Sequence, residues 1–139
     1  MGDFVTIMHA AAAMCAGGAA ASGWTGAVIV ANSAFDGLDH ARADRTLRRV
    51  LAATAGFQAA LLGIATGCAL ISGARGAGIV AAVAALGFLS NIWTLAPRRD
   101  KAPDGLKKKN STMRMVAVSL TLMMTLVALA AGVMVAIGI

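Results

Sequence analysis

Four long runs of apolar residues, almost free of charged side chains, dominate this sequence of 139 residues. They cover about residues 4–33, 47–72, 76–96 and 115–139. A helix that crosses a bilayer needs about 20 mostly apolar residues, and each run reaches that length. Backbone exposed to lipid must satisfy its own hydrogen bonds, which excludes irregular structure from these runs. The sequence therefore predicts an all-α membrane protein, a single integral membrane domain with four transmembrane helices.

Composition argues against the common soluble classes. Hydrophobic residues make up 59% of the chain and charged residues 13%, with a mean hydropathy of +0.80. An ordinary soluble domain is about 45–50% apolar and about 25% charged. The two cysteines, Cys15 and Cys68, lie inside apolar runs and form neither a CxxC motif nor a zinc spacing. We therefore do not expect a soluble enzyme, a disordered tail or a disulfide scaffold.

Basic side chains gather in the two predicted loops, about residues 34–46 and 97–114, and beside them at the start of the second run. Eleven of the twelve lie there, and Arg75 is the exception. Short loops rich in lysine and arginine stay in the cytoplasm, so we expect both termini to lie outside. Because the connections are short, the four helices should form an up-down bundle.

The same charge predicts the partner of this basic surface. A basic soluble protein would point to nucleic acid, but here the bases flank apolar helices and face the anionic inner leaflet of a bilayer. The predicted cytoplasmic anchor comprises Arg45, Arg48, Arg98, Arg99, Lys107, Lys108, Lys109 and Arg114. We therefore expect no nucleic acid partner. We expect a multi-pass protein of the cell membrane, of the kind found in the bacterial cytoplasmic membrane.

Small residues at every fourth position predict where the helices meet. Close backbone contact drives helix association in lipid, and small side chains permit it. Two such stripes are Gly18, Ser22 and Gly26 in the first run and Ala59, Gly63 and Gly67 in the second. We expect these two helices to pack tightly, and the thin bundle to associate with itself or with other membrane subunits. The first run exceeds the bilayer thickness, so its helix must tilt, extend or kink near residues 17–18.

A few polar side chains interrupt the apolar runs. Gln58 lies in the middle of the second run, while Thr121 and Thr125 share one face of the fourth. Such groups hydrogen-bond between helices, line a polar path, or contact a quinone or lipid headgroup. Near the cytoplasmic mouth of the third helix, Ser90 and Asn91 are interpreted as cap or binding groups.

His9, about two turns into the first run, is the candidate cofactor ligand. A histidine in an apolar helix can ligate haem, and Met134, expected at a similar depth, can supply the second axial ligand. The alternatives are a Cu(I) site with nearby methionine and cysteine, or a neutral histidine that is hydrogen-bonded inside the protein. Haem is therefore one hypothesis for a cofactor, within a redox protein that uses haem or quinone.

Catalytic signatures are missing from the sequence. No acidic or basic side chain lies deep inside a run, which argues against proton-coupled pumps and voltage sensors. Nor does the sequence contain a P-loop, a GxSxG elbow or an HExxH motif. The favoured interpretation is a non-catalytic integral subunit that packs into a homo-oligomer or a larger membrane complex.

The layout also resembles a known enzyme family. Arg45-x-x-Arg48 at the start of the second run, and Arg114 followed by Thr121 at the fourth, resemble elements of the MAPEG family of membrane glutathione transferases. This resemblance implies a degenerate, trimeric MAPEG-like protein with cytoplasm-facing sites between subunits. Through His9 the sequence is similarly like the four-helix CopD- and HemJ-like proteins.

Overall fold

The fold consists of long helices. The computed structural model describes residues 2–30, 32, 40–95 and 107–139. Along the chain these form α1 (Gly2–Trp24), a π-helical segment η1 (Thr25–Val30), α3 (His40–Ile71), α4 (Arg75–Leu95) and α5 (Lys107–Ala136). The all-helical prediction is confirmed for this part of the chain.

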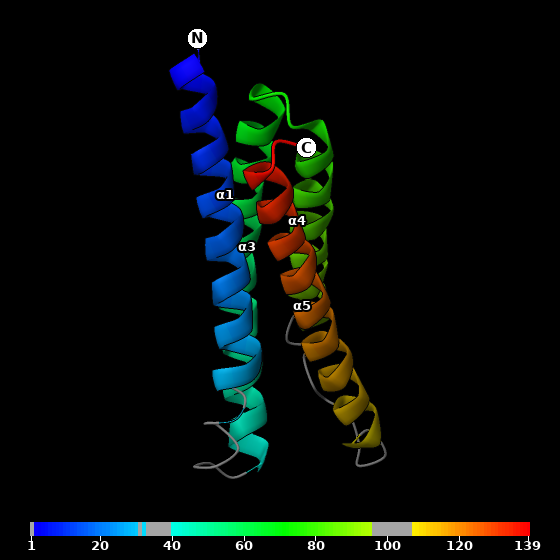
Figure 1. Cartoon of the computed structure of the whole chain (residues 1–139). Coiled ribbons are helices and arrows are strands. Elements are labelled where there is room, and N and C mark those ends of the chain that lie inside the picture. Colours follow the sequence, from blue (N-terminus) through cyan, green and yellow to red (C-terminus); the bar gives the residue numbers. More distant parts are fainter. Residues whose placement is uncertain (1, 31, 33–39, 96–106) are drawn as a thin grey trace.

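The helices form a four-membered bundle in which consecutive helices run in opposite directions (Figure 1). Helices α1 and α4 each pack against both α3 and α5, whereas α3 and α5 lie diagonally and make few direct contacts. The start of α1, the turn between α3 and α4, and the end of α5 lie together at what we call the terminal end (Figure 1). The opposite end, which carries Arg42, Arg45, Arg48 and Arg49, is called the basic end.

Each of the four predicted runs corresponds to one helical segment that is long and apolar enough to cross a membrane. These segments are Gly2–Val30, Arg45–Ile71, Arg75–Trp93 and Val118–Ala136. Residues 40–46 and 107–114, which hydropathy assigns to loops, are instead helical. Hydropathy marks only the apolar part of a helix, and the alanine, arginine and lysine residues that precede it are good helix formers.

Glycine ends α3 in a tight turn. Gly73 has a positive φ of 89°, a conformation that favours glycine over other residues. Its N–H donates to the Leu70 carbonyl at 3.2 Å, and the Ala74 N–H donates to the Ala69 carbonyl at 2.9 Å. These two bonds make a Schellman motif, which satisfies the last carbonyls of α3 and lets α4 start beside it.

Alanine builds most of the core. One cluster joins all four helices and includes Ala19, Leu62, Ala84, Phe88 and Ala128. A second cluster of alanines with Val135 lies nearer the terminal end, and a third lies near the basic end around Leu47 and Leu51. Side chains of one methyl group allow the helix backbones to approach closely, which is how helices associate in an apolar solvent.

The first helix is regular at Gly17 and Gly18, so it has no kink at this glycine pair. Residues 17 and 18 lie within the regular α-helix, which continues to Trp24. The irregularity lies further along, where Thr25–Val30 is π-helical. The first segment thus spans 29 residues, with a change of helix type after Trp24.

Candidate functional site

Four polar side chains from three helices are buried at one level of the bundle. They are Gln58 of α3, Asn91 of α4, and Thr121 and Thr125 of α5, with exposed fractions of 1%, 1%, 2% and 6%. Burying a polar group in an apolar interior costs free energy unless it is hydrogen-bonded. We call these four residues the polar cluster, and they form the candidate functional site.

Part of the polar cluster is a hydrogen-bonded link between α4 and α5. Asn91 Nδ2 donates to Thr121 Oγ1 at 2.6 Å. Thr125 Oγ1 donates to the Thr121 carbonyl, one turn earlier in α5, at 2.7 Å. The hydroxyl proton of Thr125 is therefore used within its own helix, while its oxygen can still accept a hydrogen bond.

Gln58 departs from this pattern. Its Nε2 is fully buried and has no hydrogen-bond partner among the described residues. The side chain extends toward Gly23 of α1, where a Cβ would lie 3.5 Å from Nε2. The same Cβ would overlap Thr125 Oγ1. The bare backbone of Gly23 therefore lets α1, α3 and α5 converge on Gln58 and Thr125.

Apolar layers cover the polar cluster on both sides along the bundle axis. Toward the terminal end, the alanine-rich cluster begins with Ala20 of α1, Ala59 of α3 and Phe88 of α4. Toward the basic end, Leu47 and Leu51 are buried with Val118 packed against them. The polar side chains are thus enclosed between two apolar layers.

Other hydroxyl groups in the apolar helices are satisfied locally. Thr54 Oγ1 donates to the Val50 carbonyl at 2.9 Å, and Thr66 Oγ1 donates to the Leu62 carbonyl at 2.8 Å. Ser90 Oγ donates to the Gly87 carbonyl at 2.8 Å and is exposed. Back-bonding to the preceding turn is the usual way for serine and threonine to occupy a helix. The hydroxyl protons of these residues are therefore donated within their own helices.

The structure brings together the three polar residues that the sequence singled out, Gln58, Thr121 and Thr125. The roles of Asn91, predicted to lie at the mouth of its helix, and of Gly23 were not predicted from the sequence. Asn91 shares a face with the buried Phe88 and Ala84, three and seven residues before it. That spacing was the available signal, because it continues a stripe of buried residues with a polar one.

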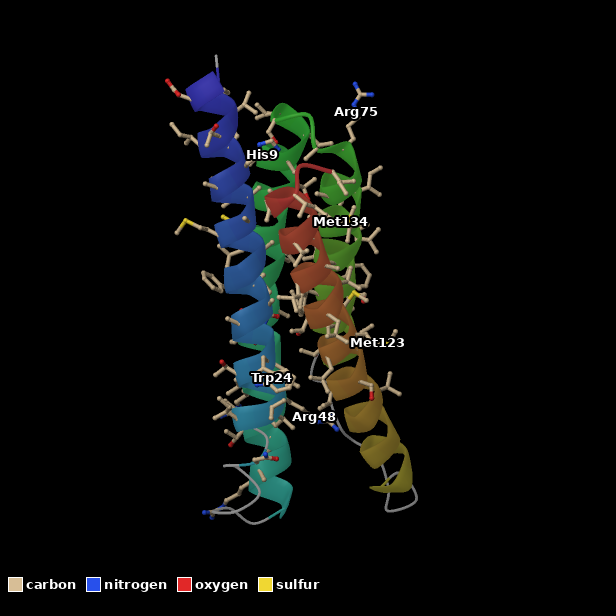
Figure 2. All side chains as sticks on the ribbon, viewed as in Figure 1. His9, Trp24, Arg48, Arg75, Met123 and Met134 are labelled. Atoms are coloured by element: carbon tan, nitrogen blue, oxygen red, sulfur yellow. The ribbon has the colours of Figure 1, made fainter. Side chains whose placement is uncertain are left out.

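His9 and Met134 do not share a site. His9, half-buried, lines a shallow groove at the terminal end with Thr6 and the last residues of α5 (Figure 2). Met134 instead extends toward α4, where a Cβ on Gly76 would lie 3.2 Å from its Cε. The described residues contain no group of three histidine, cysteine or acidic side chains able to hold a metal ion. A ligand role for His9 remains a prediction, and the structure places no second ligand beside it among the described residues.

The two small-residue stripes lie differently. Gly18 and Gly26 of α1 face α3. A Cβ on Gly18 would lie 3.6 Å from Leu61 Cδ1, and a Cβ on Gly26 would lie 3.7 Å from Thr54 Oγ1. Ser22, between these two glycines along α1, is half-buried. In the second stripe, Ala59 faces the core, but Gly63 and Gly67 are exposed. A Cβ on either glycine would meet nothing within 4 Å.

Part of the predicted basic anchor lies on α3. Arg45 is exposed and Arg48 is half-buried at the basic end, and Arg75 lies at the terminal end (Figure 2). Arg98 and Arg99 lie outside the described residues. The backbone of α5 includes Lys107, Lys108, Lys109 and Arg114, whose side chains are outside the described part.

Comparison of the chain with models of known families, with curated proteins and with solved structures finds no match. The likeness to MAPEG enzymes therefore stays a prediction from Arg45, Arg48, Arg114 and Thr121. The function must be argued from the geometry of the bundle itself.

Proposed function

We propose that this chain is a non-catalytic integral membrane subunit that associates through the outward face of α3. Four helices long and apolar enough to span a bilayer support insertion into a membrane. The exposed surface of the bundle carries large apolar side chains, such as Ile79, Leu86 and Leu126, that are compatible with lipid and not with water.

The residue sizes on the outward faces carry the proposal. The exposed face of α4 is built mainly of large side chains: Ile79, Val83, Leu86, Leu89 and Trp93. The middle of α3 instead exposes a row of small residues, with Phe57 and Ile64 beside it. This row, called the α3 small face, comprises Ala53, Gly56, Ala60, Gly63 and Gly67. It matches the surface that membrane helices use for close association.

The three glycines of the α3 small face contact no other helix within the described part of the chain. A Cβ on Gly56, Gly63 or Gly67 would meet nothing within 4 Å. A glycine inside a helix costs about 0.5–1 kcal/mol relative to alanine. Contact with another helix at this face would offset that cost, because it needs backbones that approach closely. We therefore place the subunit contact on α3.

The proposed orientation follows from charge. Arg48 lies at the basic end with the other arginines of the first turns of α3, Arg42, Arg45 and Arg49, opposite Arg75 at the terminal end (Figure 2). The positive-inside rule then puts the basic end in the cytoplasm, beside anionic lipid, and both termini outside. In this arrangement the bundle crosses the membrane up and down four times.

Association in liposomes tests the proposal. Gly63→Leu places a large side chain on the α3 small face, where the position is exposed and a Cβ meets none of the described residues within 4 Å, so it should leave folding intact. Single-molecule photobleaching of fluorescently labelled protein, at several protein-to-lipid ratios, should show oligomers for the wild type and at least a tenfold loss of association for the variant.

Ala130→Leu is the matched control, because Ala130 is exposed on α5 and outside the proposed contact. It should associate like the wild type. A wild type that is monomeric at every ratio, or equal losses in both variants, would contradict a contact through α3. Co-purification of other membrane subunits that is lost in Gly63→Leu would instead identify a larger complex.

A further inference from the structure

We propose that the polar cluster binds a buried water molecule that joins Gln58 of α3 to Thr125 of α5. The site lies between Gln58 Nε2 and Thr125 Oγ1, which both approach Gly23 of α1, and between the two apolar layers described above. Its ligand is a single water molecule, held by hydrogen bonds in the interior of the bundle. The inference rests on the fold and does not depend on association through α3.

The side-chain amide of Gln58 has a donor nitrogen, Nε2, without an acceptor among the described residues. Nε2 carries two N–H groups and is fully buried. Leaving a buried donor unpaired destabilises the folded state. Buried waters in proteins characteristically bind groups of this kind. An acceptor oxygen beside Nε2 would remove this destabilisation.

Thr125 supplies the second partner. Its hydroxyl proton is donated to the Thr121 carbonyl at 2.7 Å, so Oγ1 is left with acceptor capacity toward the interior. Both Thr125 Oγ1 and Gln58 Nε2 flank the same point beside Gly23. Gln58 offers a donor and Thr125 an acceptor, and water alone among abundant small ligands both accepts and donates with one oxygen.

Size and enclosure select water over a larger ligand. The polar side chains are at most 6% exposed. Phe88 and neighbouring alanines cover the cluster toward the terminal end, and Leu47 and Leu51 cover it toward the basic end. A quinone or lipid headgroup would have to displace one of these layers, whereas a water molecule needs only about 10–15 Å³ of space for its centre.

The water would also link two helices that hardly touch. α3 and α5 lie diagonally across the bundle and make few direct contacts. The Asn91–Thr121 bond already joins α4 to α5, and a water between Gln58 and Thr125 would add α3 to the same network. Polar groups of three helices would then be connected at one level. Such a network would hold the helices at fixed positions along the bundle axis.

Gln58 is the single glutamine of the chain, which makes the test selective. Protein labelled with ¹⁵N at the glutamine side chain gives one NH₂ signal pair in detergent micelles. We expect a cross-peak between these protons and water in an ¹⁵N-edited ROESY spectrum. Its sign should be opposite to the diagonal, which identifies a bound water rather than chemical exchange. An absent cross-peak would overturn the proposal.

The Thr125→Val variant tests the second partner and removes the hydroxyl proton that could relay magnetisation to Gln58. We expect the water cross-peak to weaken severalfold but persist. Complete loss would assign the wild-type signal to the hydroxyl, and an unchanged peak would exclude Thr125 as a partner; either result overturns the proposal. Thr66→Val, which removes a hydroxyl bonded to its own helix, is the matched control and should leave the peak unchanged.

A structure of the wild type at high resolution provides a second measurement, independent of how the variants fold. The expected result is ordered density within hydrogen-bonding distance of both Gln58 Nε2 and Thr125 Oγ1. Density beside neither atom, or a Gln58 amide that donates to a backbone carbonyl, would overturn the inference.

Discussion

Asn91 on α4 donates a hydrogen bond of 2.6 Å to the hydroxyl of Thr121 on α5, with both side chains almost fully buried. The bond joins two neighbouring helices at the level of the polar cluster, between the two apolar layers. Interhelical hydrogen bonds of membrane proteins contribute about 0.6 kcal/mol on average, and about 1.7 kcal/mol at most. This pair therefore gives a bounded prediction.

A double-mutant cycle of Asn91→Leu and Thr121→Val should yield a coupling of about 0.6 kcal/mol, and not more than about 1.7 kcal/mol. Each single variant should destabilise the fold, because it removes one partner of a buried hydrogen bond. Reversible unfolding in mixed micelles, followed by circular dichroism, measures all four free energies. Additive effects within error would show that the bond contributes nothing to stability.

Gly23→Ala should destabilise the bundle by about 1–3 kcal/mol, because the new methyl group overlaps Thr125 Oγ1. Gly17→Ala is the matched control: a Cβ there meets nothing within 4 Å. That change should be neutral or stabilising by up to about 1 kcal/mol, through helix propensity. Thermal unfolding of both variants measures the difference.

The same overlap predicts a rescue. Thr125→Ala removes the hydroxyl that the Gly23→Ala methyl group meets, so the double variant should be more stable than the sum of the two single effects implies. A simple sum would place the cause of the Gly23→Ala defect somewhere other than this contact.

Phe88→Ala and Leu86→Ala should differ sharply in stability. Phe88 is 0% exposed in the main core cluster, whereas Leu86 is 65% exposed on the outer face of the same helix. Truncating the buried ring should cost about 3 kcal/mol or more. Truncating a leucine that faces apolar solvent should cost little, since lipid replaces the lost contacts. Unfolding in bicelles provides the measurement, and equal losses would argue against a lipid-facing surface at Leu86.

Cysteine labelling should report the orientation. In a background of Cys15→Ala and Cys68→Ala, an impermeant maleimide should modify Arg75→Cys in intact cells. Arg45→Cys should react only after the membrane is opened. The two positions are matched, since each is an exposed arginine at one end of the bundle. The reverse pattern of labelling would invert the proposed topology.

The positions of the helices could be read from the sequence, because each segment must supply about 20 apolar residues to suit a bilayer. Their polar extensions could not. His40 and Lys107 begin helices in stretches where hydropathy is low, and helix propensity, not apolar character, decides the structure there. The change to π-helix at Thr25 likewise has no hydropathy signal.

The residues of the polar cluster could be selected from the sequence by type, but the sequence did not show which way their side chains point. Gln58, Thr121 and Thr125 stand out in apolar runs, and all three are buried. Gly63, by contrast, matches a packing motif yet faces outward, because spacing alone does not tell which of several alanine- and glycine-rich faces is turned inward. Only contacts among all four helices decide that choice.

The π-helical segment Thr25–Val30 has a consequence for changes in chain length. A π-turn holds about one residue more than an α-turn, so deleting a single residue there would restore an unbroken α-helix. Residues beyond the deletion would keep their direction relative to Gly23, because the turn then has one residue fewer to accommodate. We expect this segment to absorb a one-residue deletion while Gly23 keeps its place beside Thr125, whereas a deletion in the preceding turns of α1 would misalign Gly23 itself.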